Sequence, residues 1–191
     1  MKQSLQPDKK SHTRNLALLV LLSALGGLTS LLVGYAGRAV SSFGILPLVF
    51  PQLLTGFHVI WLTIAFALVR AHGSATFVGA LKGLIETVFS SHLGPLAFLV
   101  SLTQGLTIDL VFIILKKPKP LTISLASGLS AVCSLVIVQF LFWPVTPLAI
   151  ILLAYATAFF SASVLSGYLT KRVMQALPSS SQFKNQKITQ T

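Results

Sequence analysis

Six long apolar runs are the feature that most limits what this chain can fold into. They cover approximately residues 16–35, 50–69, 74–90, 95–115, 121–143 and 146–169. A helix needs about 20 residues to cross the hydrocarbon core of a bilayer, and five of the runs reach or approach that length. The run over 74–90 is shorter and contains two charged residues, so it is the least secure span. The pattern predicts an all-α membrane protein, a bundle of about six transmembrane helices.

The composition supports this class and excludes an ordinary soluble domain. Of the 191 residues, 54% are hydrophobic and 9% are charged, whereas soluble domains carry about 25% charged residues. We expect a multi-pass protein of the cell membrane with a transmembrane domain over 16–170. Residues 1–15 and 171–191 are polar and basic, which is typical of cytoplasmic tails, and we expect the second tail to be disordered.

The basic residues predict the orientation of the bundle. Between the expected spans, one side holds Arg38 alone, and Lys82 lies inside a run. The positive-inside rule therefore places both termini in the cytoplasm. The net charge of +11 is explained in this way by topology and not by nucleic-acid binding. The other twelve lysines and arginines fall on the opposite side: Lys2, Lys9, Lys10, Arg14, Arg70, Lys116, Lys117, Lys119, Lys171, Arg172, Lys184 and Lys187.

Lys82 and Glu86 are the charged residues expected within the membrane. A charge at the bilayer centre costs about 2.5–3.5 kcal/mol even on insertion scales. Charged residues at this depth therefore indicate a structural or functional role. Because they are four apart, they share one helix face, about 6 Å apart along the axis. They could be a neutralising pair that lets a marginal helix insert, or the polar wall of a substrate pocket.

Gln104 and Asp109 lie in the next run, toward its middle and its cytoplasmic end. Gln104 could join two helices by hydrogen bonds or line a pocket. Asp109 could reach the inner surface, pair with Lys116 or Lys117, or serve a function.

His58 and Trp61 are three apart in the second run, so they share a helix face near the expected depth of Glu86. His58 could be satisfied structurally or contact a ligand, and Trp61 could stack on a flat ring.

Small residues recur every four positions in two runs, which allows a second helix to approach closely. Packing within the bundle explains at least one of these stripes, and a partner subunit could use the other. The stripes are Gly26, Ser30 and Gly34 in the first run, and Ala154, Ala158, Ala162 and Ser166 in the last.

No motif indicates catalysis or a cofactor. The sequence contains no phosphate-binding loop, no H-E-x-x-H and no C-x-x-C. Cys133 is the single cysteine and lies in an apolar run, where we expect a buried and inert thiol. A small intramembrane enzyme, or a proton-coupled transporter that uses Glu86 and Asp109, is the competing interpretation.

Two stretches, residues 79–96 (GALKGLIETVFSSHLGPL) and 101–112 (SLTQGLTIDLVF), resemble the middle of YkoE-like proteins. These are S-components, the substrate-binding subunits of energy-coupling factor (ECF) vitamin importers, associated with thiamine or its hydroxymethylpyrimidine precursor. The resemblance implies a six-helix, non-catalytic subunit that captures a vitamin from outside.

The resemblance also implies partners. The subunit would dock on a transmembrane coupling subunit driven by two cytoplasmic ATPases. S-components carry an Ala-x-x-x-Ala-like docking stripe on the first helix, and Gly26, Ser30 and Gly34 occupy the comparable place. We expect the substrate to contact Glu86, Lys82, Gln104, His58 and Trp61, with the connection over 35–50 closing above it.

The orientation can be tested with reporter fusions along the chain. Fusions at residues 1, 72, 118 and 191 should report a cytoplasmic location, and fusions at 92 and 145 an external one, because of the basic flanks. An external signal at residue 118 would contradict this topology.

Overall fold

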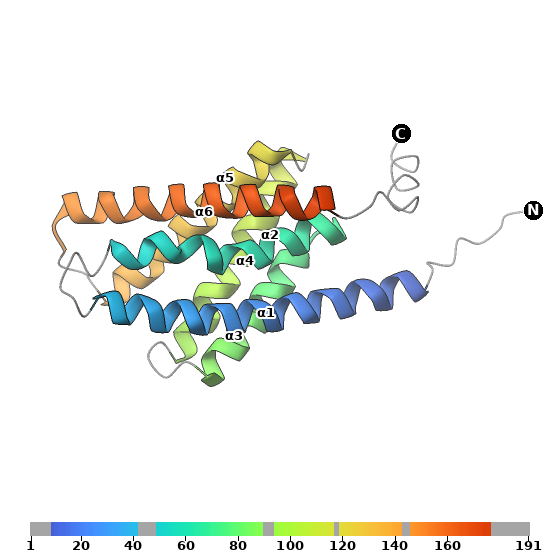
Figure 1. The fold of residues 1–191 in the computed structure, drawn as a ribbon, viewed down its shortest axis with the longest axis horizontal. Coiled ribbons are helices and arrows are strands. Elements are labelled where there is room, and N and C mark those ends of the chain that lie inside the picture. The colour runs from blue at the N-terminus through green and yellow to red at the C-terminus, as the bar shows by residue number, and fades with distance from the viewer. Residues whose placement is uncertain (1–8, 42–48, 90–93, 117–118, 143–145, 177–191) are drawn as a thin grey trace, which may run out of the picture.

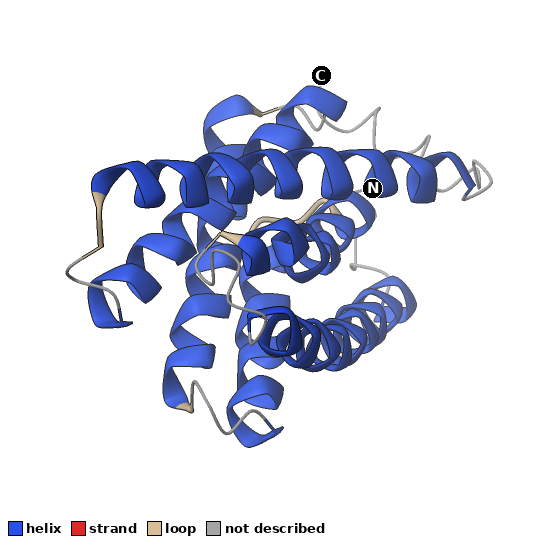
Figure 2. Cartoon of the chain, turned by 60° about the vertical axis from the view of Figure 1, so that its left-hand side comes forward, coloured by secondary structure: helices blue, strands red, loops and turns tan. Residues whose placement is uncertain are grey.

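The computed structural model describes residues 9–41, 49–89, 94–116, 119–142 and 146–176. Every regular element in these ranges is helical (Figure 2). In chain order, the elements are α1 (Lys9–Ser41), the 3-10 turn η1 (Phe50–Leu54), α2 (Thr55–Val69), α3 (Ser74–Phe89), α4 (Pro95–Leu115), α5 (Pro120–Phe142) and α6 (Leu148–Ala176).

The helices confirm the all-α membrane fold. Among the described residues, five helical segments are long and apolar enough to cross a membrane, and α3 is not one of them. With 16 residues, α3 is about 24 Å long at 1.5 Å per residue, which is less than the hydrocarbon core. The structure differs from the sequence prediction at the two ends of the chain. Helix α1 begins at Lys9 and α6 continues to Ala176, so parts of both expected tails are helical.

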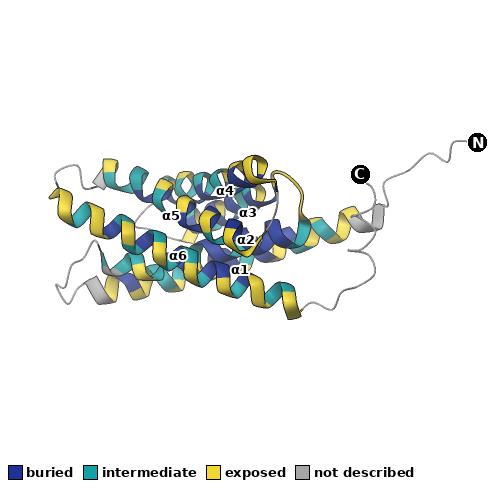
Figure 3. Cartoon of the chain, turned by 90° about the horizontal axis from the view of Figure 1, so that it is seen from above, coloured by how far each residue is buried: buried dark blue, intermediate teal, exposed yellow. Residues whose placement is uncertain are grey.

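The long helices α1 and α6 run along the bundle, and the start of α1 and the end of α6 lie at the same end (Figure 1). This arrangement agrees with an even number of crossings; which side of the membrane that end faces stays a prediction. Exposed residues line the outer faces of the helices (Figure 3), and many are large and apolar, such as Leu32 and Phe160. Lipid suits such a surface. Cys133 lies on it as well, so the expectation of a buried thiol was wrong.

Helices α3 and α4 pack with their backbones unusually close together. A Cβ atom on Gly79 would collide with the carbonyl oxygen of Ser101, and one on Gly83 would lie 2.8 Å from Phe98 Cα. On the other helix, a Cβ atom on Gly105 would lie 2.5 Å from the carbonyl oxygen of Ala75. Three glycines thus allow a helix contact that larger residues would prevent.

The α6 stripe and the first two residues of the α1 stripe pack within the bundle. Gly26 and Ser30 are buried, and a Cβ atom on Gly26 would lie 3.2 Å from Lys82 Cδ and 3.3 Å from Trp61 Cβ. The α6 stripe is fully enclosed, and its Ser166 hydroxyl lies 2.6 Å from that of Thr63 in α2. Neighbouring helices contact Gly26 and Ser30, whereas Gly34 is half-buried, and docking of a partner on the α1 stripe stays a prediction.

The glycine contact between α3 and α4 predicts the effect of a single methyl group. Gly79→Ala should lower the free energy of unfolding by about 1–3 kcal/mol, the usual cost of overpacking, since backbone atoms must move. Gly37→Ala is the matched control, because its Cβ atom would lie 3.6 Å from Pro51 Cβ, an ordinary contact. Denaturant unfolding in detergent measures both variants. Equal stability of the two would contradict the close approach.

Candidate functional site

A cavity of about 200 Å³ lies among helices α1 to α5. It is near the end of the bundle away from the termini, since Ser30 lies late in α1, His58 early in α2 and Glu86 near the end of α3. Its walls contain both polar and aliphatic residues. The lining residues are Ser30, Leu31, Gly34, Pro51, Gln52, Thr55, His58, Lys82, Glu86, Ala97, Val100, Ser101, Gln104, Ser134, Leu135 and Val138.

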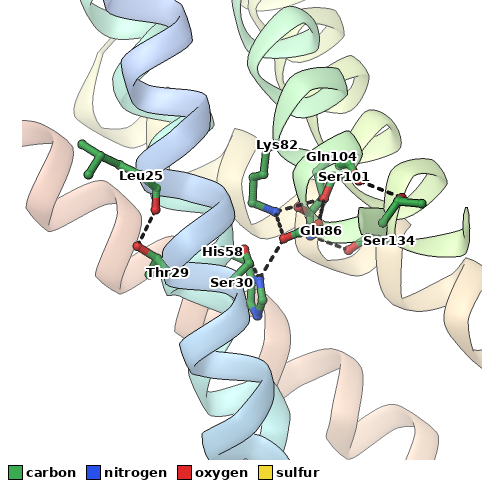
Figure 4. A network of polar contacts seen from close by, with 11 residues as sticks. Leu25, Thr29, Ser30, His58, Lys82, Glu86, Ser101, Gln104 and Ser134 are labelled. Carbon is green, nitrogen blue, oxygen red and sulfur yellow. Dashed lines mark hydrogen bonds and ion pairs between the residues drawn. The ribbon is translucent and has the colours of Figure 1, made fainter. Parts of the chain in front are cut away.

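The polar wall is built around the ion pair of Lys82 and Glu86. Lys82 Nζ lies 2.7 Å from Glu86 Oε1 and 3.0 Å from Ser101 Oγ. Ser101 donates its hydroxyl to the second carboxylate oxygen, Glu86 Oε2, at 2.5 Å (Figure 4). Lys82 is 1% exposed and Glu86 is 7% exposed. The three side chains form a closed triangle in which both buried charges have a partner.

The local fold explains this triangle. One helical turn places Lys82 and Glu86 on the same face of α3, and the glycine contact brings Ser101 of α4 within reach of both. The sequence left two interpretations of the pair open, a neutralising pair and a pocket wall. In the structure the two charges neutralise each other and also line a cavity. The two interpretations are therefore compatible.

His58 connects the pair to the first two helices. Its Nδ1 atom lies 2.8 Å from Ser30 Oγ in α1, and 3.9 Å from Glu86 Oε1 in α3. The first distance is a hydrogen bond, whereas the second is too long for one. His58 therefore lies beside the carboxylate while its position is fixed by Ser30.

Gln104 has one amide atom bound and one without a partner. The Ser134 hydroxyl donates to the carbonyl oxygen of Ala131 at 2.9 Å, so its oxygen accepts from Gln104 Nε2 at 3.1 Å. This arrangement assigns the orientation of the amide. Gln104 Oε1 is buried and has no hydrogen-bond partner among the described residues. The joining and lining roles considered for Gln104 are both present.

Asp109 lies apart from the cavity. Its Oδ2 atom accepts from the backbone N–H of Thr76 at 2.8 Å and from the Thr76 hydroxyl at 2.5 Å. Thr76 is in the first turn of α3, so the carboxylate satisfies a helix N-terminus and its positive dipole end. Among the described residues Asp109 forms no ion pair, Lys116 included; Lys117 lies outside them.

Trp61 also lies away from the described cavity wall. It packs beside Gly26 of α1, and its Nε1 atom is buried without a partner among the described residues. Trp61 is three residues after His58, and both side chains contact α1, but of the two His58 alone lines the described cavity. Residues 42–48 of the connection expected to close over a substrate lie outside the described residues, and residues 35–41 form the end of α1.

Sequence reasoning missed Ser101 and Ser134 as parts of the polar wall. The signal for Ser101 was the pair Gly79 and Gly83, four apart beside Lys82, which indicates a close neighbour on that face. Ser134 belongs to a series of serines on α5 at helical spacing, with Ser127 and Ser130. Serine inside an apolar helix was a weaker signal, because it often bonds only to its own backbone.

The arrangement suits recognition of a small polar molecule. Its lining includes a carboxylate with remaining lone pairs, an imidazole, the side chain of Gln104 and aliphatic residues. The part of the chain that the structure describes contains no cluster of three or more His, Cys, Asp or Glu residues able to hold a metal ion.

Comparison with known proteins identifies the class. A solved structure described as "Crystal structure of an S-component of ECF transporter" is similar with a TM-score of 0.77 and 21% sequence identity. The similarity covers 92% of this chain and 93% of that chain. The chain therefore has the fold of an ECF transporter S-component.

The family follows from a second comparison. Residues 14–134 match the family described as "ABC-type cobalt transport system, permease component". The match spans more than half of the chain, which belongs to this family. No curated protein matches the chain.

The ion pair predicts a large difference between single and double substitutions. Lys82→Met should lower the free energy of unfolding by about 3–5 kcal/mol, because it leaves a buried carboxylate without its cation. Adding Glu86→Leu should recover most of that loss, since no buried charge then remains. Unfolding in detergent measures the cycle. A double variant as unstable as the sum of the single ones would show that the two charges do not interact.

Proposed function

We propose that this chain is the membrane-embedded substrate-binding subunit of an ATP-driven ECF importer. Its substrate would be a small vitamin or vitamin precursor of the thiamine or hydroxymethylpyrimidine type, and the chain itself would be non-catalytic. The observation that carries the proposal is the polar-walled cavity inside a bundle with the S-component fold.

The position and chemistry of the cavity support this proposal. It lies in the half of the bundle away from the basic ends of the helices, which is the outer half if the positive-inside rule holds. An aminopyrimidine could donate to Glu86 and Gln104, with His58 and Lys82 at the edges of the same wall. Because Trp61 is not among the described lining residues, we leave it out of the proposed contacts.

A coupling subunit and two ATPases would complete the importer. The sequence contains no phosphate-binding loop of its own, so ATP would act through those partners. Docking through Gly26 and Ser30 would displace their contacts with α2 and α3, whereas Gly34 is half-buried. We therefore propose that Gly26 packs helices and that Ser30 and Gly34 form cavity wall.

Cobalt is the second candidate substrate, because the family description names it. The described cavity suits this ion poorly. Cobalt prefers several imidazole or carboxylate ligands, whereas Glu86 is held by an ammonium group and His58 is the one imidazole among the described lining residues. A bound divalent ion would lie beside the Lys82 charge.

Reconstitution tests the proposal. The chain, co-expressed with a coupling subunit and two ATPases, should co-purify with them and take up the vitamin into vesicles only with ATP. Uptake by the chain alone, driven by a proton gradient, would instead support the proton-coupled alternative. Uptake of radioactive cobalt but of no vitamin would support the second candidate.

The substitution Glu86→Gln tests whether Glu86 binds the substrate. The change keeps the volume but removes the charge, so binding should weaken by about 1.5–3 kcal/mol, the range for hydrogen bonds to charged groups. That corresponds to roughly ten- to hundredfold in affinity. Calorimetry with the small molecule that co-purifies with the wild-type chain measures the effect.

Asp109→Asn is the matched control, because this carboxylate caps α3 outside the cavity. It should lower stability and leave affinity unchanged. Unchanged affinity in a folded Glu86→Gln protein would contradict a role in binding. Glu86 would then serve only to neutralise Lys82 so that α3 can insert into the membrane.

A further inference from the structure

A groove of about 570 Å³ lies on the outside of the bundle between α3 and α4. It shares no lining residue with the cavity among α1 to α5. Its walls include four large apolar side chains that are 37–57% exposed: Phe77 on α3, and Leu106, Leu110 and Ile113 on α4. Within a membrane, a lipid chain or an apolar segment of a partner would cover such a surface.

The groove reaches the end of the bundle that holds both chain termini. Gly73, which precedes α3, and Ile113, in the last turn of α4, line it there. At this end Thr63, late in α2, bonds to Thr170, late in α6, at 3.1 Å. If the positive-inside rule holds, this part of the groove lies in the cytoplasmic leaflet.

Two basic residues end the helices at this edge of the groove. Phe66 of α2 and Phe112 of α4 stack with their ring centroids 3.9 Å apart. Arg70 and Lys116 follow these rings by four residues. Each closes its helix with a backbone hydrogen bond to the carbonyl oxygen of the phenylalanine, at 2.8 Å and 2.9 Å. The stacked rings therefore bring together two helix ends that both carry a basic residue.

Both basic side chains are available to an external anion. Arg70 and Lys116 are exposed, and neither side chain has a hydrogen bond or ion pair to another described residue. The acidic residues in the described part of the chain, Glu86 and Asp109, are buried and bound elsewhere. Helices commonly end with Gly or Asn in the left-handed conformation, whereas here two cationic residues occupy it, at φ 52° and 53°.

An anionic phospholipid matches this combination of groove and charge. Arg70 lies three residues before Gly73, and Lys116 lies three residues after Ile113, so a basic residue adjoins each wall. From Leu106 to Ile113 the groove extends about 10 Å along α4, enough for part of an acyl chain. A soluble anion would leave the apolar walls uncovered, and an apolar helix would leave the two charges without a partner.

We propose that this groove binds an anionic phospholipid, with an acyl chain against Phe77 and Leu110 and the phosphate at Arg70 and Lys116. Anionic lipids of the cytoplasmic leaflet attract lysines and arginines at its surface. The inference does not depend on the substrate of the cavity, so either can fail without the other.

Native mass spectrometry of the full-length chain in detergent tests the lipid class. Phosphatidylglycerol should bind about tenfold more tightly than phosphatidylcholine with the same acyl chains, because two basic residues act on its net negative charge. Glycerophosphoglycerol, the same headgroup without acyl chains, should fail to displace it. Equal binding of the two lipids, or displacement by the free headgroup, would overturn the proposal.

Charge variants separate a site from general attraction to a basic surface. Arg70→Asn combined with Lys116→Asn removes both charges, and asparagine tolerates the left-handed conformation at these positions. This variant should lose the preference for phosphatidylglycerol. Lys171→Asn combined with Arg172→Asn is the matched control, because it removes the same charge from α6 outside the groove. An equal loss in both variants would show surface charge only and contradict the proposal.

A variant that fills the groove tests the place of the acyl chain. Leu110→Trp should weaken binding of phosphatidylglycerol about tenfold without a change of charge. Leu153→Trp is its control, since Leu153 is 48% exposed on α6 and lies outside the groove. Unchanged binding in a folded Leu110→Trp protein would overturn the proposal. So would cross-linking of a Leu110→Cys variant to the coupling subunit when no lipid is retained, because the groove would then belong to that partner.

Discussion

The ion pair between Lys82 and Glu86 is the interaction on which the rest of the site depends. Two charges in a bilayer are tolerated only when each has a partner, and here each also bonds to Ser101. The pair fixes one wall of the cavity and places His58 beside a carboxylate. Within the described part of that wall, the two charges cancel each other. A polar cavity wall can therefore exist in the membrane at a lower electrostatic cost than an unpaired charge would carry.

Backbone contact between helices makes this pair possible. Because Gly79 and Gly83 lack side chains, α4 approaches closely enough for Ser101 to bond to both charges. Gly26 allows α1 to cover the lysine stem from the other side. The short helix α3 is thus held between two long helices, and Asp109 of α4 completes its N-terminus. A helix that is marginal as a membrane span becomes the element that carries the charged residues.

The small-residue stripes show where pattern analysis fails. The spacing of Gly26, Ser30 and Gly34, like that of Ala154 and Ala158, predicts close helix approach, and the structure confirms it at Gly26, Ala154 and Ala158. The spacing does not identify the neighbouring helix, because an internal helix and a partner subunit require the same small residues. His58 and Trp61 have a similar ambiguity. Side chains three residues apart on a helix differ in direction by about 60°. This difference is enough for His58 to line the cavity while Trp61 does not.

The sequence by itself determined the membrane class, the approximate spans, the weakness of α3 and the pairing of Lys82 with Glu86. These follow from hydropathy and from spacing within one helix, which are local properties of the chain. Only the tertiary structure decided that Ser101, Ser30 and Ser134 join the site, that Asp109 caps a helix, and that Gln104 Oε1 has no described partner. Those facts depend on how helices far apart in sequence rotate and approach one another. Apolar helices in lipid leave that rotation open until small residues and hydrogen bonds fix it.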